Sequence, residues 1–177
     1  MTESVVFLSP VRWDADPAWR RLPSACAREH HVIVMEPPVF DATEPELELR
    51  RDDVIVAVPH FDPDTQADVV ELAQRRMVER LLDELPTRRP VLWYRDAAAL
   101  GFTHLVRPHA IVYDPGANAP RCARDQLLRQ YADVVLADPA RDLSWIDVWP
   151  LLDRAIAARA MRASGLHAVT GTRLATT

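Results

Sequence analysis

Charged side chains follow two apolar runs of this 177-residue sequence, at the points where buried strands would end. Arg95 and Asp96 come directly after Pro90–Tyr94, and Asp114 follows Ala110–Tyr113. Such runs are typical of strands in a parallel sheet, and the carboxyl ends of parallel strands meet at one edge. Carboxylates accept hydrogen bonds from sugar hydroxyls, and arginine can hold a phosphate. The pattern therefore predicts a polar cleft for a hydroxyl-rich ligand.

Two further acids, Asp14 and Glu36, follow the first two apolar runs and are expected at the same edge. For Asp14 and Asp96, capping and loop solvation are equally good interpretations. Aromatic residues at these positions are more often core or cleft wall than platforms for stacking sugars. The residues assigned to the cleft are Trp13, Asp14, Glu36, Tyr94, Arg95, Asp96, Asp114 and Asn118.

Most sequence markers of cofactor and metal chemistry are absent. With only four glycines, no GxGxxG fingerprint is possible, and neither GxSxG nor HExxH occurs, so no cofactor is predicted. His60, Asp62 and Asp64 alternate as metal ligands can, but a solvated loop explains them better, and no metal site is predicted. All 21 basic residues are arginine, which excludes a Schiff-base or P-loop lysine. Cys26 and Cys122 are interpreted as cytoplasmic thiols.

The composition is that of a globular chain, 49% hydrophobic and 27% charged. The net charge of −5 argues against nucleic acid as a partner. No apolar run approaches the roughly 18 residues of a membrane span, and Met1–Ser4 lacks the basic residues of a secretory signal. A cytoplasmic protein that is not transmembrane is therefore expected.

The elements that must position the cleft alternate between strand and helix along the chain. The alternation predicts an α/β fold, a three-layer, Rossmann-like and mostly parallel sheet with helices on both faces. One domain is expected over residues 1–163, with a mobile tail at 164–177. The longest helix is expected to bury the side chains of Val69, Leu72, Ala73, Met77, Leu81 and Leu82. Strands are expected at 4–8, 32–35, 46–50, 54–58, 90–94, 110–113 and 132–137, and helices at 16–28, 65–85, 97–100, 121–130 and from 145 onward.

Several of these segments together resemble a known family. Between Val5 and Ala137 the chain is similar to the N-terminal lobe of bacterial GT-B glycosyltransferases, of the family 1 or 4-like type associated with UDP-galactopyranose mutase. The helix from Ser144 resembles the C-terminal helix that crosses back onto that lobe. The similarity is carried by Val11–Asp14, Arg28–Val32, Met35–Phe40, Pro90–Tyr94, Val112–Asp114 and Ala132–Val135.

The sequence departs from the family at two functional positions. Arg95-Asp96-Ala97 stands where the family has Tyr-Thr-Pro, and Pro115–Asn118 replaces an acidic run after Asp114. A GT-B enzyme also needs a second lobe for the nucleotide sugar, and the chain passes almost directly to the final helix. The resemblance therefore implies a glycosyltransferase-like lobe that lacks the donor-binding lobe.

Two functions are compatible with this resemblance. The first is a binding, scaffold or regulatory relative, non-catalytic alone, in cell-envelope or exopolysaccharide glycan assembly, with a homo-oligomer or a protein partner. The alternative is the catalytic subunit of a split glycosyltransferase or small transferase, with Arg95 on a phosphate and Asp114 or Asp96 as base. Either function implies a nucleotide sugar or a glycan acceptor as the ligand.

Overall fold

The computed structural model describes residues 3–15, 17–86, 89–115, 121–136 and 145–163. Asp16, Asn118, Ser144 and the tail expected at 164–177 lie outside these residues. The strands are β1 Ser4–Leu8, β2 His31–Met35, β3 Val39–Phe40, β4 Glu46–Arg51, β5 Ile55–Phe61, β6 Val91–Tyr94, β7 Ala110–Tyr113 and β8 Val134–Val135. The helices are α1 Pro17–Cys26, α2 Ala67–Asp83, the 3₁₀ helix η1 Ala97–Ala99, α3 Leu100–Thr103, α4 Ala123–Tyr131 and α5 Trp145–Ala163.

The eight strands form one sheet in which every pairing except one is parallel. Its order is β3-β5-β2-β1-β6-β7-β8. The antiparallel strand β4 pairs along Ile55–His60 of β5, so β2 and β3 follow one another along the other side of β5. From β1 the chain first builds β2 on one side and later β6 on the other, which makes the β1–β6 pair the switch point of the topology.

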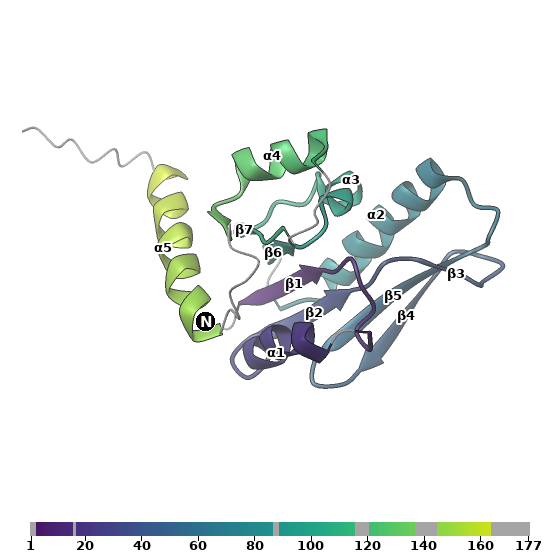
Figure 1. The fold of residues 1–177 in the computed structure, drawn as a ribbon, viewed down its shortest axis with the longest axis horizontal. Coiled ribbons are helices and arrows are strands. Elements are labelled where there is room, and N and C mark those ends of the chain that lie inside the picture. The colour runs from purple at the N-terminus through teal and green to yellow at the C-terminus, as the bar shows by residue number, and fades with distance from the viewer. Residues whose placement is uncertain (1–2, 16, 87–88, 116–120, 137–144, 164–177) are drawn as a thin grey trace, which may run out of the picture.

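Side chains of alternate residues in the strands enter two separate cores. Val5, Phe7 and Trp93 pack with α1 and α5, whereas Val6, Leu8 and Leu92 pack with α2, the α3 region and α4. The sheet therefore lies between two layers of helices (Figure 1), and the predicted three-layer, mostly parallel α/β fold is confirmed. Among the described residues, no helix has the length and apolarity that crossing a bilayer requires.

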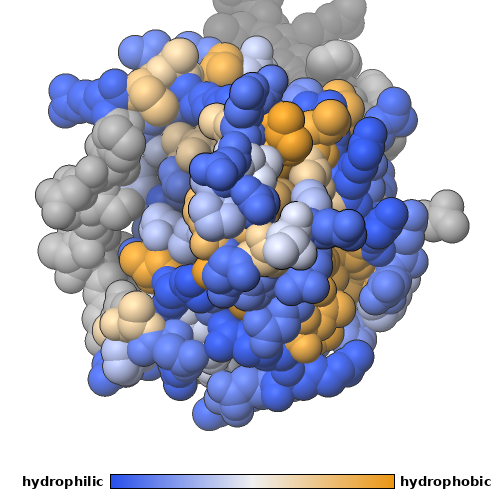
Figure 2. Space-filling model, turned by 90° about the vertical axis from the view of Figure 1, so that its right-hand side faces the viewer, coloured by the Kyte–Doolittle hydropathy of each residue, from blue (hydrophilic) through white to orange (hydrophobic). Residues whose placement is uncertain are grey.

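The buried face of helix α2 agrees only in part with the prediction: Met77 and Leu81 are buried as expected, and Ala73 and Leu82 are half-buried. Val69 and Leu72 are 47% and 45% exposed, so their predicted burial is wrong. Figure 2 shows the right-hand side of the molecule as it stands in Figure 1, and on this face apolar side chains stand among hydrophilic ones. The stripe that is buried contains one polar residue, Gln74. The prediction was based on apolar residues alone and therefore chose the neighbouring stripe with Val69 and Leu72. The members of the buried stripe are Val70, Gln74, Met77, Val78 and Leu81.

Helix α5 closes the core on the side of α1. Trp145, Val148 and Leu152 are buried there, and the ring of Trp149 lies 4.2 Å from the ring of His30. Both ring nitrogens of His30 lack a hydrogen-bond partner among the described residues, and burial lowers the pKa of its imidazole. His30 is therefore packed against the Trp149 ring, with the Glu29 carboxylate 4.0 Å from its Nε2.

Adjacent leucines of α5 test how much this packing contributes to stability. Leu152 is fully buried and Leu151 is 41% exposed. We expect Leu152→Ala to lower the free energy of unfolding by about 2–5 kcal/mol, because it removes core contacts and leaves a cavity. Leu151→Ala is the matched control and should change it by no more than about 0.5 kcal/mol. Equal effects in urea denaturation would contradict the observed orientation of α5.

Candidate functional site

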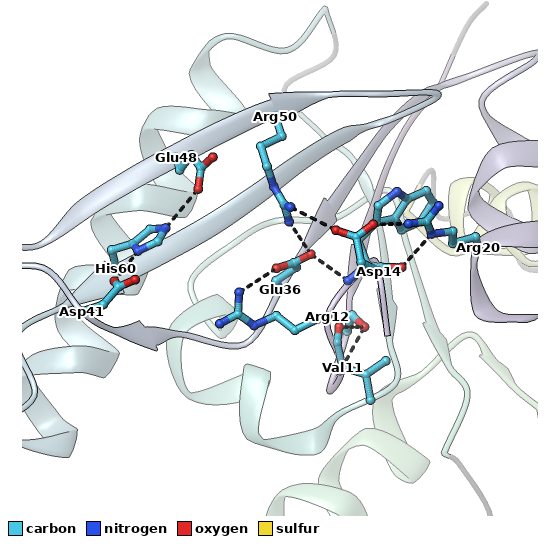
Figure 3. Close-up of polar contacts among 11 residues, drawn as sticks. Val11, Arg12, Asp14, Arg20, Glu36, Asp41, Glu48, Arg50 and His60 are labelled. Carbon is cyan, nitrogen blue, oxygen red and sulfur yellow. Dashed lines mark hydrogen bonds and ion pairs between the residues drawn. The ribbon is translucent and has the colours of Figure 1, made fainter. Parts of the chain in front are cut away.

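A buried carboxylate, Glu36, stands at the carboxyl end of β2. Its side chain is 0% exposed and its Oε1 accepts two hydrogen bonds of 2.7 Å, from the backbone N–H of Trp13 and from Nη2 of Arg50. Nη1 of Arg12 lies 3.7 Å from Oε2 (Figure 3). Two arginines therefore compensate this buried charge, which would otherwise be costly to remove from water.

The loop after β1 is fixed by Trp13 rather than left open for a ligand to stack on. Trp13 is buried, and its indole N–H donates to Oδ2 of Asp52 at 3.2 Å. Nε of Arg20 donates to the Trp13 carbonyl at 2.8 Å. The next residue, Asp14, is exposed and its carboxylate pairs with two arginines (Figure 3). Oδ1 pairs with Arg20, and Oδ2 lies 3.3 Å from Nη1 of Arg50. Trp13 is thus part of the core on the α1 side of the sheet, and Asp14 lies at the surface.

A second ion pair joins the ends of β6 and β7. Nε of Arg95 lies 3.5 Å from Oδ2 of Asp114, and the Arg95 guanidinium stacks over the ring of Trp19 at 4.3 Å. Burial raises the pKa of Asp114 above its ordinary value, and the positive charge of Arg95 only partly opposes that shift. A carboxyl group with a raised pKa beside a cation is suited to proton transfer.

Two of the predicted cleft residues, Tyr94 and Asp96, do not lie beside the ion pair of Arg95 and Asp114. The Tyr94 hydroxyl is buried against Oγ1 of Thr103, 2.7 Å away, and burial raises its pKa to about 12. Oδ1 of Asp96 accepts the backbone N–H of Ala98 at 2.9 Å and so caps η1. Asn118 lies outside the described residues. Because side chains alternate along β6, Trp93 and Arg95 face the layer of α1, whereas Tyr94 and Asp96 face that of α2.

A pocket of about 200 Å³ opens on the α2 side of the sheet, beyond the carboxyl ends of β1 and β2. In an open α/β sheet, ligands bind in the crevice at this switch point. Glu36 and Asp96, both expected from the sequence, lie in its lining. The complete lining is Leu8, Ser9, Met35, Glu36, Pro37, Pro38, Ala67, Glu71, Gln74, Asp96, Ala98, Ala99, Phe102 and Arg124.

Four polar residues of this pocket were missed by sequence reasoning: Ser9, Gln74, Glu71 and Arg124. Nη2 of Arg124 pairs with Oε2 of Glu71 at 2.7 Å, and its Nη1 donates to the Ala98 carbonyl at 3.0 Å. The pair covers Gly101, where an added Cβ would collide with the Glu71 carboxylate. The one available signal was Gln74, a polar residue in an apolar helical stripe. The pairing across α2 and α4 had no local signature.

The weakly metal-like segment at His60 has another explanation in the structure. Nδ1 of His60 lies 2.6 Å from Oδ1 of Asp41, and Nε2 lies 3.2 Å from Oε2 of Glu48 (Figure 3). The imidazole thus connects β5 to β4 and to the residue after β3. No cluster of three or more potential ligands is found among the described residues.

Comparisons with known proteins address the fold. No protein-family model matches the sequence, and no curated protein is recognisably related to it. A solved structure from E. coli, described as trehalose-6-phosphate bound with UDP-2-fluoro glucose, is similar with a TM-score of 0.50 and 14% identity. The likeness covers 85% of this chain and 43% of the other, so this chain spans less than half of that protein's length. At this identity the likeness supports a GT-B-like fold and nothing finer.

The contacts of His60 make the stability of the β4–β5 region depend on pH. Its hydrogen bond to Asp41, with that to Glu48, raises the pKa of His60 above 6.5. A histidine whose pKa is higher in the folded than in the unfolded protein stabilises the fold fully at a pH below its unfolded pKa. This stabilisation is lost as the pH rises through its folded pKa. We therefore expect His60→Gln to destabilise the protein more at pH 6 than at pH 8.5 in urea denaturation. The exposed His31→Gln is the control, and a pH-independent difference for His60→Gln would contradict this assignment.

Proposed function

We propose that this chain is a glycosyltransferase-like lobe that binds a carbohydrate ligand at its carboxyl edge and does not catalyse transfer alone. The role is that of a binding, scaffold or regulatory protein of cell-envelope or exopolysaccharide glycan assembly in the cytoplasm. The observation that carries the proposal is the pocket at the β1–β6 switch point, whose mainly apolar lining carries a few polar side chains suited to hydroxyl groups. The GT-B-like fold and the share of the neighbouring structure that the chain spans support it.

Partner binding is the second part of the proposal. Transfer between two lobes requires a surface for the other lobe, which here comes from a second copy or a separate enzyme. On α5, a large apolar side chain is exposed near each end of the helix, and a partner lying along the helix would cover both. Ile146 is 80% exposed and Met161 is 55% exposed.

A catalytic role, as half of a split glycosyltransferase or as a small transferase, is favoured by one specific observation. Asp114 combines a raised pKa with the adjacent Arg95. In that case Arg95 holds a phosphate of the nucleotide sugar and Asp114 is the base. Asp96 is less suited to be the base, since its carboxylate already caps η1.

Calorimetric titration with UDP, GDP and their hexose conjugates, followed by an assay for nucleotide release, tests these functions. We expect saturable binding of one nucleotide sugar without turnover by the isolated chain. Arg95 lies outside the pocket lining, on the α1 side of the same edge, so Arg95→Ala tests the contact with the phosphates of the nucleotide sugar. It should weaken binding by about tenfold or more, since charged hydrogen bonds contribute about 1.5–3 kcal/mol. The exposed Arg107→Ala, at the opposite end of the strands, is the control.

Turnover by the isolated chain that disappears in Asp114→Asn would establish the catalytic alternative instead. If neither nucleotide sugars nor simple glycans bind the folded protein, the carbohydrate-binding proposal is wrong.

A further inference from the structure

The outer edge of β4 has no partner strand among the described residues. β4 lies at the margin of the sheet, at the end away from α5 (Figure 1), and pairs with β5 alone. Its sequence over Glu46–Arg51 is Glu-Leu-Glu-Leu-Arg-Arg, and its ladder with β5 has no bulge. An exposed edge of this kind offers a row of unpaired backbone groups to another strand, so proteins usually shorten, bend or cover it.

The register of the hairpin shows which backbone groups of β4 point outward. The N–H of Asp52 donates to the Val54 carbonyl at 2.9 Å and so continues the ladder between β4 and β5. Bonded and non-bonded pairs alternate in an antiparallel ladder. Pro59, which has no N–H to donate, accordingly stands opposite a non-bonded position. The residues that bond to β5 are therefore Glu46, Glu48 and Arg50, and those whose backbone groups point outward are Leu47, Leu49 and Arg51.

The order of the charges along β4 suits a second copy of the same strand. Both acidic residues precede both arginines. Two copies side by side in the antiparallel sense place the acidic half of one beside the basic half of the other, whereas parallel pairing would place like charges together. Opposite charges that face each other across two strands stabilise the pair, and like charges destabilise it. Antiparallel pairing of identical strands also matches a twofold axis, the commonest symmetry of protein dimers.

One register of this pairing uses all the outward groups. With Leu49 on the twofold axis, the N–H of each Leu49 donates to the carbonyl of the other, and Leu47 pairs in the same way with Arg51 of the second copy. Glu48 then lies opposite Arg50 of the second copy, on the other face of the sheet. Leu49 is 43% exposed in the single chain, and its contact with the other Leu49 removes apolar surface from water.

We propose that this chain forms a symmetric dimer through the outer edge of β4, with the two strands antiparallel about Leu49, so that the two sheets join into one. No residue of β4 is in the lining of the pocket at the switch point. The dimer also leaves α5, at the other end of the sheet, accessible to a different protein (Figure 1). The inference goes beyond the proposed function and needs no carbohydrate ligand, so either can fail without the other.

The first test measures the mass of the full chain by sedimentation equilibrium over a range of concentrations. We expect a concentration-dependent shift from 20.0 kDa to twice that mass. Leu49→Arg places two arginines opposite each other at the axis and should raise the dissociation constant of the dimer by about tenfold or more. Leu72→Arg is the matched control, because Leu72 is 45% exposed on α2, and it should leave the dissociation constant unchanged.

A cross-linking variant tests the register without adding a charge. A disulfide joins Cα atoms about 4.4–6.8 Å apart, and bonded residues across two antiparallel strands lie about 5.5 Å apart. Leu49→Cys, in a Cys122→Ser background that removes the exposed native thiol, should therefore form a covalent dimer with oxidised glutathione as the oxidant. Leu72→Cys in the same background is the control and should not.

Urea denaturation shows whether each variant folds, and the cross-linking variant decides the question if Leu49→Arg does not. A chain that stays monomeric at every concentration would overturn the inference. So would a dimer that a folded Leu49→Arg variant leaves intact, an equal loss of dimer in Leu72→Arg, or the absence of a covalent dimer in the Leu49→Cys variant.

Discussion

The whole molecule depends on the burial of one short strand. β1 pairs on one side with β2 and on the other with β6, and layers of helices cover both of its faces. A strand enclosed in this way has no place for a charged group along its length, because burying one unpaired is too costly. Polar chemistry is therefore confined to the point where the central strands emerge. Ser9 and Glu36 stand where β1 and β2 end, and the ion pair of Arg95 and Asp114 follows the adjacent strands.

The sheet also divides that chemistry in two. Arg95 and Asp114 lie on the side of α1 and Trp19, whereas Asp96 and Gln74 lie on the side of α2. Arg95 and Asp96, which are adjacent in sequence at the end of β6, thus lie on opposite faces of the sheet. The α1 side pairs a cation with a carboxyl of raised pKa, and the α2 side gathers acceptors around a small hollow. The groups that the two sides offer at this edge therefore differ in charge.

Sequence reasoning located the edge well and the pocket poorly, for physical reasons. Apolar runs ending in charge identify strands and their tips, because burial of both faces leaves no alternative for such runs. Strand β3 was missed, since two residues are too few to show a periodicity. The predicted strand at 54–58 also ended three residues before β5 does. The hydroxyl of Tyr94 turns to Thr103 because alternation along β6, rather than residue type, sets its direction. The bridge between Glu71 and Arg124 joins segments far apart in the chain, and only the folded structure brings them together.

The position of β1 also has a consequence for how the protein is made. The backbone groups on one edge of β1 pair with β2, the next strand in the sequence. Those on its other edge can pair only after β6, at Val91–Tyr94, has been synthesised. During that interval an apolar strand presents unpaired backbone groups, which is the condition under which chains associate with one another. Pairing between distant segments is also slow to form. The nascent chain is therefore prone to aggregate on the ribosome until β6 pairs with β1. The yield of folded protein in a cell depends on how quickly that pairing forms.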